Sequence, residues 1–447
     1  MQPFKKAENP KQVRRVAKPL HLEAGDPRYV ALDDIRGDDI REKLRRSLYI
    51  DPDDPNRKSV HISYAGHRGN GKTTELFAFM EEMKDESFFV YKQAYSDLAV
   101  YDLDYPDLML YLVTMTLEDV CRRVEVDDDM FRSVENWFAS ETWTEQESYE
   151  SGIEVRSVAE AGFSVPGLLK LLINLTGRIT GGHKSVKEIR HRLKRKPTEL
   201  IHRMNEFFDR IRGLLEKSGM ISELVLIVDN LDRHPPEVME NAFSKWSDLF
   251  EQLNVHIIIT VPLGLIYNPQ GEPLSEFNFP PLVMPMPKIR KKEQAWDTCW
   301  QDGVDRLVDV IKARVEEDKV FAGEPDERYA CMKELVLASG GSLRELMHLL
   351  LKAAEEAWEH PIAMDDVKKG IHEVRNEFMN PLRFDDLPVL HEINRSKRAD
   401  HSPESARQLF YRFALEYNGE KWADVHPLIY SSDIFNDQEI LRRFNES

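Results

Sequence analysis

The apolar positions of the chain form short uninterrupted runs that alternate with segments of helical spacing. The runs Glu-Leu-Val-Leu-Ile-Val-Asp at 223–229 and His-Ile-Ile-Ile-Thr-Val at 256–261 are typical of strands buried on both faces of a parallel sheet. Two runs rich in β-branched or aromatic residues, at 59–64 and 87–92, predict two more strands. Apolar residues three or four apart, as in 74–83, predict helices between the strands, and one of these helices is expected at 236–253. This alternation predicts an α/β fold with a parallel sheet covered on both faces.

A segment rich in proline and asparagine, 262–287, is expected to form a loop. After this segment the apolar residues have helical spacing and no further buried-strand pattern follows directly. Helices are expected at 295–317, 327–338, 343–358 and 364–378. Because no strand pattern interrupts them, they predict a separate α-helical unit, or lid.

The C-terminal part of the chain combines helices with a hairpin signal. A short helix is expected near 386–395 and a second one at 402–412. Asn418-Gly419 then lies between aromatic residues, which is a strong signal for a two-residue hairpin turn. A helix followed by a hairpin is the pattern of a winged-helix unit.

These patterns divide the chain into four predicted parts. Residues 1–27 carry basic residues and proline with little periodicity and predict an extended N-terminal arm. Residues 28–287 are the predicted α/β core, with a mainly helical insertion at about 105–220. Residues 288–380 form the predicted helical lid, and 381–447 the winged-helix-like unit.

A glycine-rich loop follows the first predicted strand and precedes a predicted helix. It matches the phosphate-binding pattern G-x-x-x-x-G-K-[ST] at every fixed position. Glycines let backbone N–H groups surround a phosphate, and the helix N-terminus adds partial positive charge. Lys72 is expected to reach the β- and γ-phosphates, and the Thr73 hydroxyl to bind Mg²⁺. The predicted nucleotide-binding residues are Gly66, His67, Arg68, Gly69, Asn70, Gly71, Lys72, Thr73 and Thr74.

Polar residues at later positions complete a predicted catalytic set around Lys72. Asp229 ends a buried strand, as expected of a Walker B acid that binds Mg²⁺ together with Thr73. Hydrolysis also needs a group that orients water. Asn230 follows Asp229 directly and cannot take a proton, so Asp232 is the candidate base, with a helix cap or a pair with its neighbouring arginine as the alternative. Thr260 and Arg344 could each sense the γ-phosphate, Thr260 from a strand end and Arg344 from the first turn of a helix.

In chain order these motifs resemble Walker A, Walker B, sensor 1 and sensor 2 of AAA+ ATPases. The similarity is nearest to the origin-recognition and STAND-like branch, which adds a winged helix after its helical lid. The string Asp-Asn-Leu-Asp-Arg at 229–233 also resembles the Walker B of KAP-type P-loop NTPases. The resemblance implies ATP and Mg²⁺ as cofactors, ATP hydrolysis and nucleotide-gated assembly. It also implies an arginine finger from a neighbouring subunit, for which the candidates are Arg233, Arg290 and Arg314.

Composition limits the partners and the cellular compartment that are expected for this protein. The net charge of −18 over 447 residues counts against a chain that coats nucleic acid through its whole surface. Three widely spaced cysteines without metal spacing indicate reduced core residues of a cytoplasmic protein. No apolar run is long enough to span a membrane, and no apolar signal core stands at the N-terminus.

Two segments of the insertion have sequence patterns that allow separate predictions. Residues 151–166 alternate apolar and polar positions and predict a hairpin. Residues 183–196 form the only dense basic run, which is either a nucleic-acid contact or a solvated helix face of an acidic chain. The winged-helix-like unit is a second candidate route to DNA.

The first hypothesis for function is therefore an ATP-hydrolysing molecular switch that controls self-association or a separate effector protein. By analogy with relatives of that class, bacterial anti-phage defence is one setting for it. The alternatives are a DNA-binding AAA+ initiator, loader or transposition-type regulator, and a non-hydrolysing scaffold with ATP as a structural ligand.

Overall fold

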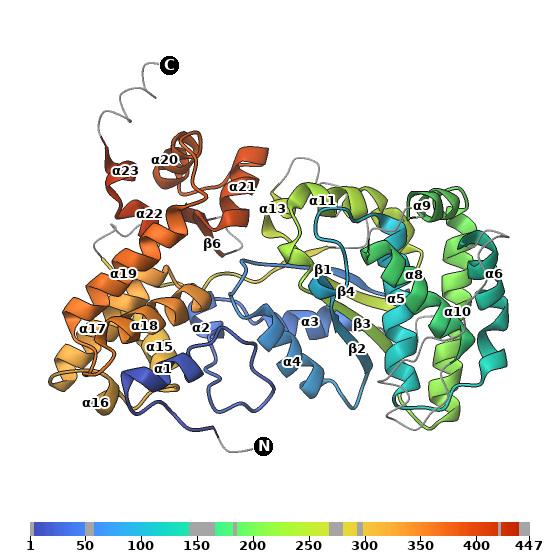
Figure 1. The fold of residues 1–447 in the computed structure, drawn as a ribbon, viewed down its shortest axis with the longest axis horizontal. Coiled ribbons are helices and arrows are strands. Elements are labelled where there is room, and N and C mark those ends of the chain that lie inside the picture. Colours follow the sequence, from blue (N-terminus) through green and yellow to red (C-terminus); the bar gives the residue numbers. More distant parts are fainter. Residues whose placement is uncertain are drawn as a thin grey trace.

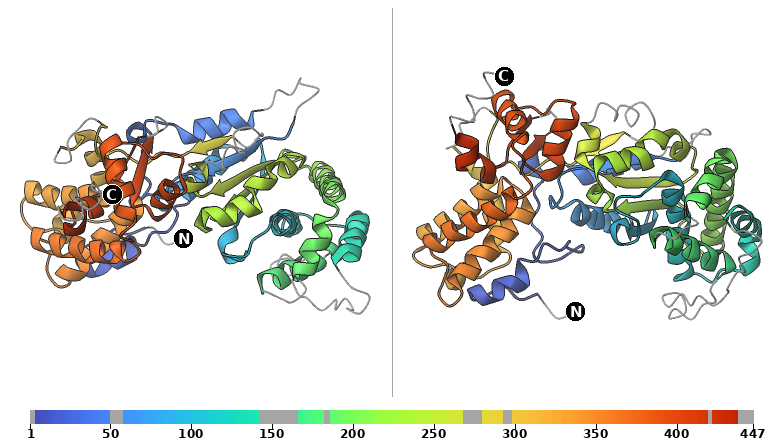
Figure 2. Two further views of the ribbon diagram at one scale, coloured as in Figure 1. Left: turned by 90° about the horizontal axis from the view of Figure 1, so that it is seen from above. Right: turned by 45° about the horizontal axis from the view of Figure 1, so that its top comes forward.

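The computed structural model describes residues 4–49, 58–142, 166–181, 186–267, 280–292, 298–418 and 422–437. A central sheet separates two helical regions (Figure 1). The helices inserted between β2 and β3 lie at one end of the molecule. The lid helices and the C-terminal unit lie at the other end, and all views agree on this arrangement (Figures 1 and 2).

The sheet has five parallel strands in the order β2-β3-β4-β1-β5. Gln93 of β2 stands opposite Asp229 of β3, and Tyr64 of β1 stands opposite Thr260 of β4. The carboxyl ends of the strands thus meet at one edge, where ligands bind in sheets of this kind. The strands are β1 (His61–Ala65), β2 (Phe88–Gln93), β3 (Leu224–Asp229), β4 (His256–Val261) and β5 (Pro281–Val283).

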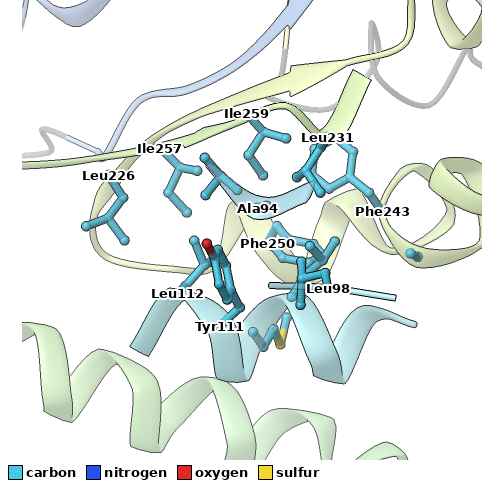
Figure 3. Packing of buried hydrophobic residues seen from close by; sticks show 14 of the residues in the cluster. Ala94, Leu98, Tyr111, Leu112, Leu226, Leu231, Phe243, Phe250, Ile257 and Ile259 are labelled. Atoms are coloured by element: carbon cyan, nitrogen blue, oxygen red, sulfur yellow. The ribbon is translucent and has the colours of Figure 1, made fainter. Parts of the chain in front are cut away.

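Both faces of the sheet are covered, because alternate strand residues enter two hydrophobic clusters. Val225 and Ile227 belong to the cluster that includes residues of α3 and α4, whereas Leu226 belongs to the cluster of α5, α10 and α11. Figure 3 shows Leu226, Ile257 and Ile259 packed toward α5. The covering helices are α3 (Ile40–Leu48), α4 (Lys72–Glu82), α5 (Tyr105–Cys121), α10 (Pro197–Lys217), α11 (Pro236–Ala242) and α12 (Ser247–Glu251).

The helices between β2 and β3 begin with α5, whose N-terminus is fixed by a capping box of Asp104 and Asp107. The apolar face of α8 packs against α5 and α6. No helix of the described residues, α8 included, is long and apolar enough to cross a membrane. The other elements here are η1 (Ala94–Ser96), η2 (Asp128–Phe131), α6 (Arg132–Thr142), α8 (Gly167–Thr180) and α9 (Val186–Lys194).

The lid and the C-terminal unit have the order that the sequence predicts. Helices α20 and α21 precede an antiparallel hairpin of β6 and β7, as in a winged-helix-like unit. The lid contains α15 (Gln301–Lys312), α16 (Glu317–Val320), α17 (Pro325–Ser339), α18 (Leu343–Ala357) and α19 (Met364–Met379). The C-terminal unit contains α20 (Asp386–Ser396), α21 (Pro403–Tyr411), β6 (Ala414–Asn418), β7 (Trp422–Val425), α22 (Pro427–Tyr430) and α23 (Asp433–Asn436).

The structure confirms the P-loop α/β core and differs from the sequence predictions in three regions. The predicted loop 262–287 contains β5, an edge strand that starts at a proline, and the short helix α13 (Leu263–Ile266). The single helix expected from 236 to 253 is broken at Phe243 into α11, η4 (Ser244–Trp246) and α12. The N-terminal arm, expected to be extended, contains α1 (Pro10–Val16), and the short helix α2 (Asp33–Arg36) precedes α3. The hairpin expected at 151–166 lies outside the described residues.

Candidate nucleotide site

The glycine-rich loop connects β1 to α4 at the carboxyl edge of the sheet. Gly66, Gly69 and Gly71 all have positive φ, and α4 begins at Lys72. A Cβ atom at Gly69 would collide with the Cβ of Arg344, in addition to the strain of its φ of +83°. The loop therefore adopts a curved path that depends on glycine, with its N–H groups at the start of a helix.

A cavity of about 290 Å³ opens at this loop. Its lining contains eight lysine or arginine side chains against three carboxylates, although the chain as a whole is acidic. The excess of positive charge suits a phosphate chain. The charged lining residues are Lys18, Arg28, Arg36, Arg68, Lys72, Glu75, Asp229, Asp232, Arg233, Arg314 and Arg344.

Lys72 lies folded back within the loop. Its Nζ donates to the carbonyl oxygens of Gly66 and His67, at 2.8 and 3.0 Å, and forms a buried ion pair with Asp232 Oδ2 at 2.7 Å. Asp232 is held in this place by the 3-10 turn η3 (Leu231–Arg233). The pair with Arg233 that the sequence left open is absent from the described contacts, where Arg233 lies over the ring of Tyr95. Asp232 and Lys72 thus both line the cavity and are partners of each other.

The two predicted metal ligands lie next to each other. Thr73 donates its hydroxyl proton to Asp229 Oδ2 at 2.6 Å, and Asp229 is almost fully buried at the end of β3. The backbone N–H of Asn230 donates to Asp229 Oδ1 at 2.7 Å. A hydroxyl and a carboxylate are the oxygen ligands that Mg²⁺ prefers, so the pair fits that ion.

Thr260 does not line the described cavity. Its hydroxyl is fully buried, accepts a hydrogen bond from the N–H of Leu231 at 3.2 Å, and donates to the carbonyl of Val228. These contacts tie β4 to the turn that carries Asp232. In the described structure Thr260 therefore fixes that turn, and its role as a γ-phosphate sensor stays a prediction.

Arg344 reaches the loop from the first turn of α18. Its side chain contacts Gly69, and its Nε is buried without a hydrogen-bond partner among the described residues. Burial and the neighbouring Arg412 lower the pKa of Arg344. Asn230, which follows Asp229, has φ of 67°, a conformation that asparagine tolerates better than most residues.

The site includes residues that the motifs do not reveal. Arg36 is 1% exposed, donates to the carbonyl of Asn70 at 2.8 Å and pairs with Glu75 at 3.0 Å. Tyr91 donates to Asp229 at 2.8 Å. No sequence signal marks Arg36. Tyr91 lies near the carboxyl end of β2, at the edge of the sheet where ligands are expected, so its place near the site could have been predicted from the sequence.

The N-terminal segment closes the apolar side of the cavity. The N–H of Leu22 donates to the Thr74 hydroxyl at 3.1 Å and so attaches residues 18–22 to the start of α4. Tyr29 contributes its ring and donates to Glu75 at 3.3 Å. The remaining apolar lining is Pro19, Leu20, Leu22, Val30, Leu32, Val310, Leu343 and Met347.

The C-terminal unit contacts the phosphate-binding loop directly. The backbone N–H of Glu416 in β6 donates to His67 Nε2 at 2.8 Å. Arg68 donates to the carbonyl of Phe410 at 3.1 Å and lies over its ring at 4.4 Å. Two variable positions of the P-loop motif are therefore occupied by contacts to a unit that lies more than 300 residues later in the chain.

The same unit also contacts the lid helix that carries Arg344. Arg412, at the end of α21, forms a buried ion pair with Glu345, which also accepts from the Ser342 hydroxyl. Tyr417 donates to the carbonyl of Gly340 at 2.9 Å. Burial alone would raise the pKa of Glu345, but Arg412 and its other partners hold that pKa below its usual value. The P-loop, lid and C-terminal unit thus meet at one junction.

The buried histidines of this junction make stability depend on pH. Burial lowers the pKa of His67 and of His426 to about 3, and His67 must stay neutral to accept from Glu416. Below about pH 6.5 the unfolded chain binds more protons than the folded one, so stability falls as pH falls toward 3. We expect each histidine to cost roughly 2 kcal/mol between pH 7.5 and pH 5.

Urea unfolding at pH 7.5, 6 and 5 measures this loss. The His67→Gln variant keeps an acceptor but cannot be protonated in this range, so its stability should fall less steeply than that of the wild type. Equal slopes for the two proteins would contradict the assignment.

The basic run of the insertion is largely neutralised by neighbouring carboxylates. Arg190 pairs with Asp107 at 2.7 Å and with Asp102 at 2.8 Å, and Lys194 pairs with Asp104. Arg192 pairs with Glu188, and Lys196 pairs with Glu141. These pairs favour the interpretation of α9 as a structural element of the insertion.

Arg190→Ala is therefore expected to destabilise the fold by about 2 kcal/mol, because buried Asp107 loses its cation. The cost stays moderate because burial already raises the pKa of Asp107 to about 6, so this carboxyl can take up a proton. The matched control is Arg195→Ala at an exposed position, with an expected change within about 0.5 kcal/mol. Urea unfolding measures both, and equal stabilities of the two variants would contradict the structural role.

Comparison with solved structures finds chains that are similar over most of their length at low sequence identity. The chain is similar to the Aeropyrum pernix Orc1 protein in complex with DNA, with 12% identity, a TM-score of 0.36, and coverage of 97% of this chain and 98% of that chain. It is similar to Cdc6p from Pyrobaculum aerophilum, with 12% identity, a TM-score of 0.33, and coverage of 93% and 99%. It is also similar to the RuvB Holliday junction branch migration motor of Thermotoga maritima, with 13% identity, a TM-score of 0.33, and coverage of 92% and 97%.

No protein-family model matches the chain, and no curated protein matches it. The P-loop fold itself is established by this chain's own strand order, glycine loop and strand-terminal Asp229.

Proposed function

We propose that this chain is an ATP-binding and ATP-hydrolysing switch of the AAA+ type, in which the nucleotide at the P-loop controls the position of the C-terminal unit. The observation that carries this proposal is the shared use of the loop. His67 and Arg68 hold β6 and α21, while the glycines and Lys72 of the same loop form a phosphate-binding geometry. A ligand that changes the conformation of the loop therefore changes the contacts that hold the C-terminal unit.

Each part of the cavity suits one part of ATP. The loop N–H groups, Lys72 and Arg344 suit the phosphates, since they are the cationic end of the cavity. Leu22, Val30 and the other apolar residues under the N-terminal segment suit the base. Thr73 and Asp229 would hold Mg²⁺, which when bound neutralises charge on the phosphate oxygens.

Phosphate binding requires an exchange of partners at Lys72. In the structure its ammonium is satisfied by Asp232 and by two loop carbonyls. The ionised oxygens of a triphosphate would offer Lys72 several charged acceptors in place of one carboxylate and two neutral carbonyls, and hydrogen bonds with an ionised partner are roughly twice as strong as neutral ones. Asp232 is then released at the phosphate end of the cavity, where it can orient or deprotonate water.

Hydrolysis is expected to be slow under this scheme. Asn230 occupies the position next to the metal-binding acid and cannot act as a base, and Asp232 acts only after it has left Lys72. Slow turnover suits a switch, because the triphosphate state then lasts long enough to expose the C-terminal unit to a partner. We propose that this partner is a second copy of the chain or a separate effector protein.

The experiment that tests the function is a titration of the purified protein with ATP and ADP in the presence of Mg²⁺, followed by measurement of phosphate release. Binding of both nucleotides with slow release supports the proposal. An Asp229→Ala variant provides the comparison, since it should bind nucleotide without the Mg²⁺-dependent increase in affinity. A wild-type protein that binds neither nucleotide would contradict the proposal.

A further inference from the structure

We propose that Tyr91 is a positioning residue for the Asp229 carboxylate and so sets the Mg²⁺ affinity of the nucleotide site. This inference rests on the proposed function and extends it to a residue outside the Walker motifs. Tyr91 lies in β2, the strand next to the one that ends in Asp229. Its hydroxyl donates to Asp229 Oδ2 at 2.8 Å.

The carboxylate of Asp229 is oriented by three donors. Oδ2 accepts from the hydroxyls of both Tyr91 and Thr73, and Oδ1 accepts from the N–H of Asn230. A carboxylate has about four acceptor sites, so these bonds leave one site, on Oδ1, available to Mg²⁺. Tyr91 thus helps to decide which carboxylate oxygen stays available.

The direction of the Tyr91 hydrogen bond is itself fixed. Gln93 Nε2 donates to the Tyr91 hydroxyl oxygen at 3.1 Å, so the phenolic proton is left for Asp229. Gln93 and Tyr91 lie on the same face of β2, two residues apart, and Gln93 stands opposite Asp229 in the register. Pairing of β2 with β3 therefore holds Gln93, Tyr91 and Asp229 in positions where the first donates to the second and the second donates to the third.

The ring of Tyr91 is also held in place. It packs against Phe77 of α4, with ring centroids 4.8 Å apart, and Phe77 in turn packs against His21 of the N-terminal segment at 5.0 Å. Because α4 carries Thr73, the same helix supports both partners of Asp229 Oδ2. Loss of the phenolic hydroxyl alone would leave this packing intact and remove only the hydrogen bond.

Groups that orient a metal ligand without touching the metal commonly contribute 10–100-fold to metal affinity. The Tyr91→Phe variant isolates that contribution. The matched control is Tyr111→Phe, because Tyr111 also donates to a carboxylate, Asp97 at 2.9 Å, but neither residue lines the nucleotide cavity. Both variants lose one phenol–carboxylate hydrogen bond and keep the ring.

The test measures binding of a fluorescent ATP analogue in EDTA and across a Mg²⁺ titration, with Mn²⁺ binding followed by electron paramagnetic resonance. For Tyr91→Phe we expect nucleotide affinity in EDTA equal to that of the wild type, and a Mg²⁺ midpoint and a Mn²⁺ dissociation constant raised about 10-fold. Tyr111→Phe should match the wild type in all three. Metal dependence of Tyr91→Phe equal to that of the wild type would overturn this inference while leaving the proposed function intact. A wild-type protein that binds no nucleotide would overturn both.

Discussion

Replacement of Lys72 by alanine is expected to weaken ATP binding about 100-fold, because hydrogen bonds from a cation to the phosphates contribute about 1.5–3 kcal/mol. Lys72 is the only described cation whose ammonium contacts both the loop carbonyls of Gly66 and His67 and the acidic turn at Asp232. Titration with a fluorescent ATP analogue measures the loss. An affinity equal to that of the wild type would contradict the assigned role of Lys72.

The same substitution should also destabilise the fold, and this effect can be separated from binding. Removal of Lys72 leaves Asp232, which is 5% exposed, without its cation, at an expected cost of about 3 kcal/mol. The Lys72→Ala/Asp232→Asn double variant removes the unpaired charge, so we expect stability to recover while ATP binding stays weak. Urea unfolding and ATP titration of both variants test this. Recovery of binding together with stability would show that the loss in Lys72→Ala came from unfolding alone.

Arg412→Ala is expected to destabilise the protein by about 3 kcal/mol and to loosen the C-terminal unit. Arg412 is the cation that pairs with buried Glu345, so its loss leaves a carboxylate for which Ser342 is the remaining hydrogen-bond donor among the described residues. The pair connects α21 to the first turn of α18, one residue from Arg344. The variant should therefore unfold at lower urea concentration and show faster amide exchange in β6 and β7.

The matched control for Arg412→Ala is Arg395→Ala. Arg395 belongs to the same unit and pairs with Glu392, but its side chain is 76% exposed. Exposed pairs contribute about 0.2–1 kcal/mol, so this control should remain close to the wild type. Equal stabilities of Arg412→Ala and Arg395→Ala would contradict the role of the buried pair in docking the C-terminal unit.

The sequence predicted those parts of the fold in which local pattern and final structure agree. The apolar runs at β3 and β4 are buried on both faces, and their pattern needs no tertiary information to be recognised. The edge strand β5 has only three residues, begins with a proline and becomes a strand only by pairing with β1, so its local pattern resembles a loop. Helix α11 ends near Phe243, where tertiary packing of a fully buried ring overrides helical spacing.

The site was predictable to the extent that its residues belong to motifs of fixed spacing. The Thr73 and Asp229 pair, and the approach of Arg344 to the loop, follow from such motifs. The contacts of His67 and Arg68 could not be predicted, because they fill variable motif positions and their partners lie in a different unit. The pairing of Lys72 with Asp232 was also missed, since the motif describes how the lysine contacts phosphate and does not describe its contacts within the protein.

The most direct test of the account follows the amide of Glu416 by hydrogen–deuterium exchange, with and without ATP and Mg²⁺. In the structure this amide donates to His67 of the phosphate-binding loop. If nucleotide at the loop controls the C-terminal unit, exchange of the peptide that contains Glu416 should rise when ATP binds to the wild type. It should stay unchanged in Lys72→Ala. Saturating ATP that binds to the wild-type protein and leaves this exchange unchanged would contradict the central claim.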